Sequence, residues 1–201
     1  MKKQIRRIAL GCVSVLLGGV SGLATAEPTE MVIGLDVQHA PAYVAAMEEY
    51  YGSGGAQDIG VALWTNAFEG ASDVTHTLVI EFDDYDELEK VTDARNSDPA
   101  WTNYLRSING LIDIKSRTMA VERLRDGSGW RQHGALAAFI MTVTDPATYA
   151  AAFAELIDSS ENPGSVRLME LRFGGQGATH AALISAEGPA ALNEYLDELL
   201  S

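Results

Sequence analysis

The chain has 201 residues and carries 28 aspartates and glutamates against 14 lysines and arginines, which gives a formal net charge of −14. A surface this acidic repels the phosphates of nucleic acids and the head groups of anionic lipids, so the composition excludes nucleic acid as a partner. Cys12 is the only cysteine, so no disulfide can form within the chain and the fold must depend on its hydrophobic core.

The first 26 residues have the pattern of a secretory signal peptide. Four basic residues among the first seven precede an apolar run at 8–23, and Ala24 and Ala26 supply the small residues of a cleavage site. The run is short and rich in glycine, whereas a membrane-spanning helix needs ~20 apolar residues. We therefore expect cleavage after Ala26 and a periplasmic or secreted protein without a membrane segment.

The first half of the mature region, residues 27–125, alternates strand and helix patterns. Residues 31–37 place side chains of different size on two faces, which predicts a strand. Residues 42–51 place Tyr43, Met47 and Tyr50 at helical spacing. The remaining patterns predict a hairpin of strands at 61–68 and 74–82, helices at 83–93 and 100–108, and a strand within 111–124 that is best placed at 117–124.

The second half, residues 134–201, repeats this order after a linker at 126–133 that contains glycine and serine. Its patterns predict strands at 135–143, 166–173 and 178–185 and helices at 146–157 and 189–200. It therefore lacks the last strand of the first half, unless a partner or the first half supplies one.

Matching residues recur between the halves. The pairs Thr75 with Thr179 and His76 with His180 lie 104 positions apart, and further matches are Ile80 with Ile184, Leu88 with Leu192, Phe68 with Phe173, and Tyr43 with Tyr149. The offset drifts only slowly, as short loop deletions would cause. We interpret the pattern as an internal tandem duplication.

A βαββαβ unit of this size is typical of a ferredoxin-like fold. The segment THTLVIEFDDYDEL, followed by a helix and then SDPAWTNYL, resembles the dimeric α/β-barrel superfamily, which includes the antibiotic-biosynthesis-monooxygenase-like domains. The resemblance implies two ferredoxin-like sheets that face each other, with helices outside and a ligand cavity between. We expect an α+β fold in which two tandem ferredoxin-like βαββα(β) units form such a barrel within one chain.

The resemblance also implies candidate catalytic residues. Members that oxygenate aromatic polyketides or degrade haem use an Asn, a Trp and a His, Tyr or Arg in the cavity. By this resemblance Trp64 would bound the cavity, Asn66 would hydrogen-bond a substrate oxygen, and His76 would accept or donate a proton. His180, the counterpart of His76, and Arg172 are candidate ligand-binding residues from the second hairpin.

The sequence allows alternatives for two of these assignments. His76 and His180 could instead serve only to satisfy hydrogen bonds at the ends of their hairpins. The face of Trp64 and Asn66 matches Met169 and Leu171 in the second half, so we expect this mostly large, apolar face to pack under the helices. The opposite face would then line the barrel, with Leu63 and Leu168 among its residues.

The four histidines show no close metal-ligand spacing, and no glycine-rich loop opens a helix in the phosphate-binding manner. We expect neither a metal nor a cofactor. The sequence favours an exported module that binds a small, partly apolar ligand in or near the barrel. The alternatives are a cofactor-independent monooxygenase and, ranked lower, haem handling; a homodimer is compatible with the pattern.

Overall fold

The computed structural model describes residues 27–53, 59–67, 72–162 and 164–199. The expected signal peptide and Phe68 lie outside the described residues. Within them, seven strands form one antiparallel sheet in the order β2-β3-β1-β4-β6-β7-β5. The strands are β1 (Thr29–Val37), β2 (Gly60–Thr65), β3 (His76–Phe82), β4 (Ile112–Gly127), β5 (Ala135–Met141), β6 (Gly164–Phe173) and β7 (His180–Ala186).

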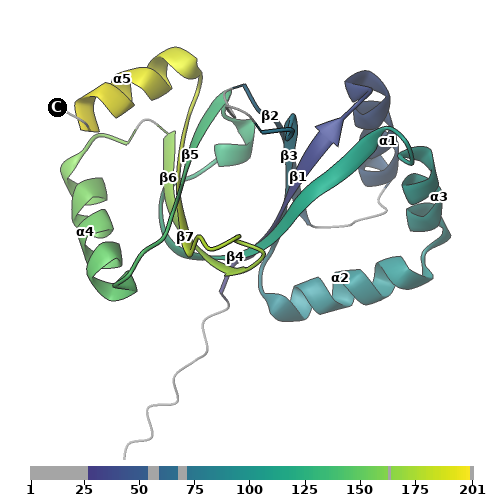
Figure 1. Cartoon of the computed structure of the whole chain (residues 1–201), viewed down its shortest axis with the longest axis horizontal. Coiled ribbons are helices and arrows are strands. Elements are labelled where there is room, and N and C mark those ends of the chain that lie inside the picture. The colour runs from purple at the N-terminus through teal and green to yellow at the C-terminus, as the bar shows by residue number, and fades with distance from the viewer. Residues whose placement is uncertain (1–26, 54–58, 68–71, 163, 200–201) are drawn as a thin grey trace, which may run out of the picture.

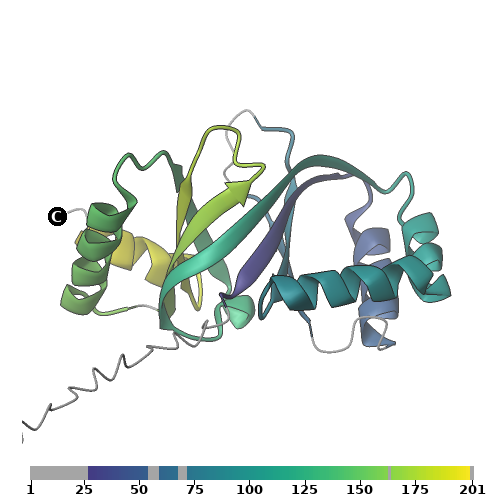
Figure 2. The ribbon, with the colours of Figure 1, turned by 90° about the horizontal axis from the view of Figure 1, so that it is seen from below.

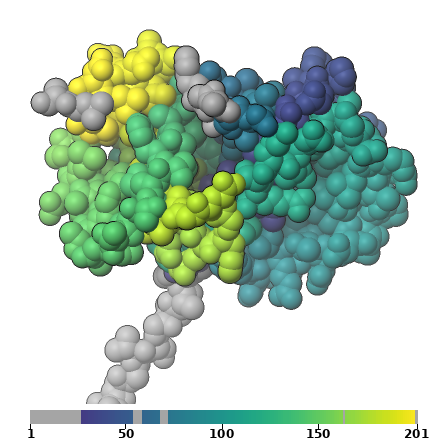
Figure 3. All heavy atoms as spheres, in the orientation of Figure 1, coloured from purple at the N-terminus to yellow at the C-terminus, as the bar shows by residue number. Residues whose placement is uncertain are grey.

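Helices cover the outer side of the curled sheet at both ends of the molecule (Figure 1). The helices are α1 (Ala40–Gly52), α2 (Tyr85–Ser97), α3 (Pro99–Ser107), α4 (Pro146–Ser159) and α5 (Pro189–Leu199), and a 3₁₀ turn, η1 (Trp130–Gln132), precedes β5. The first half, in purple to teal, and the second half, in green to yellow, occupy opposite sides of the molecule (Figure 3). Among the described residues no helix is long and apolar enough to cross a membrane.

Local sequence explains where the helices begin. Asp84 caps α2 by accepting a hydrogen bond from the backbone N–H of Glu87 at 2.9 Å, and Asp98 caps α3 by accepting from Ala100 at 2.8 Å. Proline occupies the first turn of α1, α3 and α4, where its missing N–H costs nothing.

The long strand β4 joins the two halves. It pairs with β1 along its first part and with β6 along its last part, and its register shifts at Met119/Ala120 and Glu122/Leu124. Such irregularities bend a strand and increase its twist. Figure 2 shows β4 in teal running beside β1 and across to the second half.

Strand β4 differs from the strand expected at 117–124, because it begins at Ile112 and ends at Gly127. Its first residues, Asp113 to Ser116, lie in the 111–124 range but outside the best-placed part of the expected strand, and they pair with the end of β1. Residues 126 and 127 of the expected linker are also part of the strand. Pairing with two neighbours therefore extends β4 beyond what its own composition indicates.

Each half has its own core between sheet and helices. In the first half, Ile33, Leu35, Leu78, Ile80 and Phe82 of the sheet pack against Tyr43, Met47 and Tyr50 of α1 and Tyr104 of α3. In the second half, Val166, Leu168, Ala182, Ile184 and Ala186 pack against Phe153 of α4 and Leu192 and Tyr195 of α5. The strand order of the second half, β6-β7-β5, matches β2-β3-β1 of the first.

Candidate functional site

The two predicted histidines have the same local hydrogen bonds. The Thr75 hydroxyl accepts from the backbone N–H of Val37 at 2.8 Å and shares a hydrogen bond with His76 Nδ1 at 2.9 Å. In the second half, the Thr179 hydroxyl accepts from Val143 at 2.8 Å and shares a hydrogen bond with His180 Nδ1 at 2.9 Å. Each Thr–His pair therefore ties the start of one strand to the end of its neighbour.

The structure does not bring these histidines into one cavity. His76 follows the side-chain alternation of Leu78 and Ile80, which face the helix-covered core of the first half. His180 follows the alternation of Ala182 and lies in the core of the second half. Burial lowers the pKa of His76, which favours its neutral form at pH 7.

The expected face assignment of the hairpin strands is wrong. Leu63 and Leu168 pack in the helix-covered cores, whereas Met169 belongs to a separate cluster on the opposite face with Ala120 and Ala181. Trp64 lies on that opposite face as well, where its ring stacks on Trp130 at a centroid distance of 6.2 Å. This face, which we call the interior face, is the concave side of the curled sheet.

Asn66 and Arg172 make only local contacts. The Asn66 amide oxygen accepts from the Thr77 hydroxyl at 3.0 Å, and its nitrogen donates to the Val74 carbonyl at 3.3 Å. Arg172 is 41% exposed in its side chain and pairs with Glu170 of its own strand at 3.1 Å. Of the five residues predicted from the sequence, Trp64 and Asn66 lie on the interior side of the sheet, and the five do not form one site.

A cluster that sequence reasoning missed lies on the interior face. It consists of three carboxylates and three guanidinium groups, and we call it the interior cluster: Glu30, Glu81, Glu122, Arg125, Arg131 and Arg167. Arg167 of β6 pairs with Glu30 of β1 and lies 3.4 Å from Glu122 and 3.8 Å from Glu81. Because β3 and β6 are three places apart in the sheet, this contact requires the sheet to curl.

Arg167 is the centre of the cluster. It is 1% exposed, and its guanidinium stacks over the ring of Trp130 at 4.1 Å. Trp130 in turn donates its indole N–H to Glu81 at 2.9 Å. The segment expected to be a linker, residues 126–133, therefore places its tryptophan in the interior.

The two remaining arginines of the interior cluster, Arg125 and Arg131, balance the charges of Glu122 and Glu81. Arg125 contacts Glu122 at 2.7 Å, and Arg131 contacts Glu81 at 2.8 Å. Gly60 makes room for Arg131, since a Cβ atom at position 60 would lie 1.7 Å from its Nη1 atom. Arg167, Met169 and Trp130 are all at most 2% exposed, so side chains fill the described interior at this point.

Burial raises the pKa of Glu30, with further contributions from the neighbouring Glu81 and Glu122, while Arg167 opposes the shift. A raised folded-state pKa means that the contribution of this group to stability is complete below its unfolded pKa and is lost as pH rises through the folded pKa. Glutamine does not titrate. We therefore expect the stability deficit of Glu30→Gln relative to the unmodified chain to shrink as pH rises from 4.5 to 8.

Urea unfolding of both chains across this pH range measures the effect. A deficit that grows with pH would show that Arg167 outweighs burial and lowers the pKa of Glu30.

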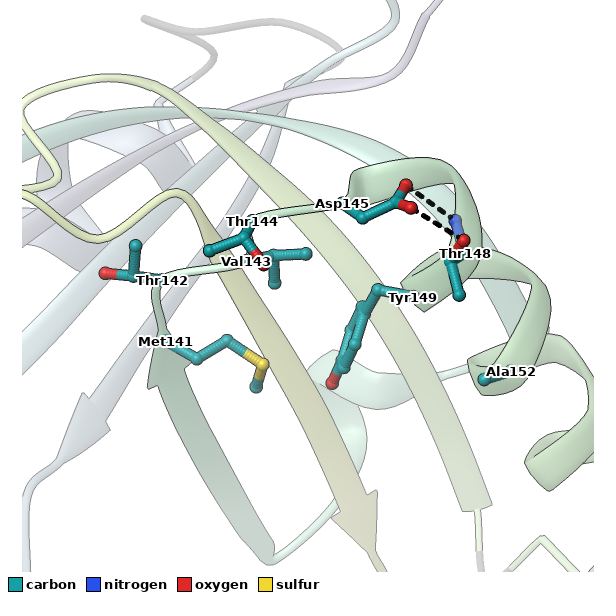
Figure 4. Close-up of a pocket in the computed structure, with 8 residues that line it drawn as sticks. All are labelled: Met141, Thr142, Val143, Thr144, Asp145, Thr148, Tyr149 and Ala152. Atoms are coloured by element: carbon teal, nitrogen blue, oxygen red, sulfur yellow. Dashed lines mark hydrogen bonds between the residues drawn. The ribbon is translucent and has the colours of Figure 1, made fainter.

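A surface groove of about 370 Å³ lies between the end of β5 and the start of α4. Its lining is mainly small or apolar and is drawn in Figure 4: Met141, Thr142, Val143, Thr144, Asp145, Thr148, Tyr149 and Ala152. The Asp145 carboxylate turns toward the first turn of α4, where it accepts from the backbone N–H of Thr148 at 3.1 Å and from its hydroxyl at 2.8 Å. These bonds lower the pKa of Asp145 and hold its charge at the rim.

His180 lies beside this groove. Its ring centroid is 6.3 Å from that of Tyr149, and its neighbour Thr179 bonds to Val143 of the lining. The groove therefore combines apolar side chains, threonine hydroxyls and a phenol, with a buried imidazole next to the phenol.

The corresponding place in the first half is covered by α3. Tyr43 and Tyr149 both occupy the first turn of the helix that follows the first strand of their half. Their backbone N–H groups donate to the backbone carbonyls of His39 and Asp145 respectively. Tyr43 is 1% exposed and hydrogen-bonds to Tyr104 of α3, whereas Tyr149 is only half-buried. Among the described residues, no helix packs over Tyr149 as α3 packs over Tyr43.

Comparisons with known proteins show the fold. No protein-family model matches the sequence, and no curated protein matches it. A "putative monooxygenase" from Fusobacterium nucleatum superposes with a TM-score of 0.57 at 15% identity, over 86% of this chain and 81% of that chain. A "putative chlorite dismutase" gives 0.54 at 10% identity over 88% and 86%, and a variant of chlorite dismutase from Candidatus Nitrospira defluvii gives 0.51 at 10% over 87% and 82%.

These likenesses show an α+β fold with a curled antiparallel sheet, of the ferredoxin-like and dimeric α/β-barrel type. The expected fold class is confirmed to that extent. At identities this low the likeness concerns the fold alone.

Proposed function

We propose that this chain is a small-molecule-binding module and that the groove at the start of α4 is its binding site. The observation that carries the proposal is an open groove of about 370 Å³ whose lining is largely apolar and which adjoins His180 and Tyr149. Ligand sites typically combine such apolar walls with a few polar groups that fix orientation.

The chemistry of the groove indicates the class of ligand. Met141, Val143 and Ala152 offer an apolar wall, and the hydroxyls of Thr148 and Tyr149 offer polar contacts. Asp145 and the net charge of −14 disfavour an anion. A neutral, partly apolar molecule of aromatic size fits these features.

We further propose that the two halves arose by tandem duplication and that the loss or gain of α3 made them different. Support comes from the matching Thr–His hydrogen bonds and the matching strand orders. Tyr50 of the first half stacks on Tyr104 at 4.9 Å, whereas Leu156, at the matching place in α4, is exposed. Export after cleavage at Ala26 remains part of the proposal and would place the ligand outside the cytoplasm.

A titration with 1-aminoanthracene, a neutral fluorescent aromatic amine, tests the binding site. We expect saturable fluorescence enhancement, and we expect Ala152→Trp to reduce it at least tenfold because the indole fills the groove. Ala151→Trp is the matched control, since Ala151 is the adjacent exposed residue of α4 and does not line the groove. An equal loss of fluorescence enhancement in Ala152→Trp and Ala151→Trp, or no saturable binding by the unmodified chain, would contradict the proposal.

A cofactor-independent monooxygenase is the second candidate. Trp64 on the interior face beside Trp130 and the likeness to the "putative monooxygenase" favour it. However, Asn66 is engaged with Thr77 and His76 faces the other side of the sheet, so the residues carried over from the family do not converge here. Oxygen uptake with a bound aromatic phenol would distinguish turnover from binding alone.

Haem ligation by His180 does not fit the structure. An axial ligand must present a side chain to an open space large enough for the macrocycle. His180 is buried against Tyr149, and its Nδ1 atom is bonded to Thr179.

A further inference from the structure

Strand β5 forms one edge of the sheet. It pairs with β7 on one side, and no described strand pairs with it on the other. This outer side is the place where the last strand of a complete ferredoxin-like unit would lie, as β4 lies beside β1 in the first half. The backbone N–H and C=O groups along this edge are a template for another strand.

The edge is apolar and exposed. Three consecutive residues, Ala138, Phe139 and Ile140, are exposed, with Phe139 at 46% and Ile140 at 61%. A run of exposed apolar residues on a strand indicates either a binding surface or a risk of aggregation. Natural edge strands are usually protected by a charge, a proline or a bulge, and β5 (ALAAFIM) has none of these.

We propose that a second copy of this chain pairs with β5, antiparallel, about a two-fold axis at Ala138. Leu136 then lies opposite Ile140 of the partner on one face, and Ala137 lies opposite Phe139 on the other. Each pair occurs twice by symmetry, as in any isologous interface. The small Ala137 side chain leaves room for the large Phe139 ring, so the strand is complementary to itself.

The uncharged edge is the part of the surface where a second copy meets the least local repulsion. The chain as a whole carries a net charge of −14, so two copies repel each other over most orientations. Residues 134–144 contain no charged side chain, so pairing through β5 places no like charges opposite each other. The pairing joins two seven-stranded sheets into one continuous sheet across both chains.

The other sheet edge, β2, is less suited to this role. Its residues from Gly60 to Trp64 are at least partly covered, and Arg131 contacts Glu81 across Gly60. Of the two edge strands, β5 is the one that carries exposed apolar side chains.

A single cysteine at position 138 tests the proposed two-fold axis. In the full chain with Cys12→Ser, Ala138→Cys places two thiols opposite each other, and directly opposed residues of antiparallel strands have Cα atoms about 4.5–5.5 Å apart, within disulfide range. We expect mild oxidation to convert most of the protein to a covalent dimer that reducing agent reverses. Ile114→Cys, at an exposed residue of β4, is the control and should stay largely monomeric under the same conditions.

Sedimentation velocity of the full chain gives an independent measurement. We expect a dimer at micromolar concentration, a shift to monomer in Ile140→Lys, and no shift in Ile114→Lys. Circular dichroism and the melting temperature verify that each variant is folded. A monomeric unmodified chain, a dimer that survives Ile140→Lys in a folded protein, or equal cross-linking at positions 138 and 114 would each overturn the proposal.

Discussion

Replacement of Arg167 by methionine should lower the free energy of unfolding by about 3–5 kcal/mol, the range measured when one partner of a buried ion pair is removed. Methionine keeps much of the length and apolar contact of the side chain but leaves Glu30, Glu81 and Glu122 facing one another without the central cation. Glu30 is itself buried, so water cannot replace the lost guanidinium. Urea unfolding at pH 7 measures the change.

The matched control lies in the same strand. Arg172 pairs with Glu170 at the surface, and Arg172→Met should cost less than about 1 kcal/mol, as exposed ion pairs do. Glu30→Gln should also be milder than Arg167→Met at pH 7, because Arg167 would still face two carboxylates. If Arg167→Met cost no more than Arg172→Met, the interior cluster would not hold the two halves together.

The order of strands and helices could be predicted from the sequence, because their signals are local. Alternation in β1, turn residues before β3, and the capping aspartates of α2 and α3 each act over a few residues. The same holds for the matching Thr–His pairs, which mark equivalent strand starts in the two halves. The arrangement of the two units, with their sheets facing each other, was expected only from the resemblance to the dimeric α/β-barrel superfamily.

The orientation of the strand faces could not be predicted in this way. Both faces of this sheet are largely buried, one under helices and the other in the concave interior, so apolar residues occur on both. Leu63 and Trp64 are adjacent and both large, and their sequence offers no reason to place either one outward. Only the packing of Leu63 against the first core and of Trp64 against Trp130 decides it.

The interior cluster was missed because its members are distant in sequence and resemble solvated charges. Glu30 and Arg167 are 137 residues apart, and each looks like the polar position of an alternating strand. A weak signal did exist: Trp130 stands in a segment of glycine, serine and charged residues, where a large aromatic side chain has no reason to be exposed.

Replacement of Trp130 by alanine should also destabilise the fold strongly, by about 3–5 kcal/mol, because it removes a large buried ring. The ring is 2% exposed, stacks with Trp64 and Arg167, and donates its N–H to Glu81, so the variant loses packing between both halves and leaves Glu81 with fewer donors.

Trp130→Phe separates the two effects, since it keeps an aromatic ring but loses the hydrogen bond to a charged group, for an expected cost of about 1.5–3 kcal/mol. Phe173→Ala, at an exposed aromatic of β6, is the control and should change stability by no more than about 0.5 kcal/mol. Urea unfolding followed by circular dichroism measures all three variants, and a cost for Trp130→Ala as small as that for Phe173→Ala would mean that η1 does not anchor the connection between the halves in the interior.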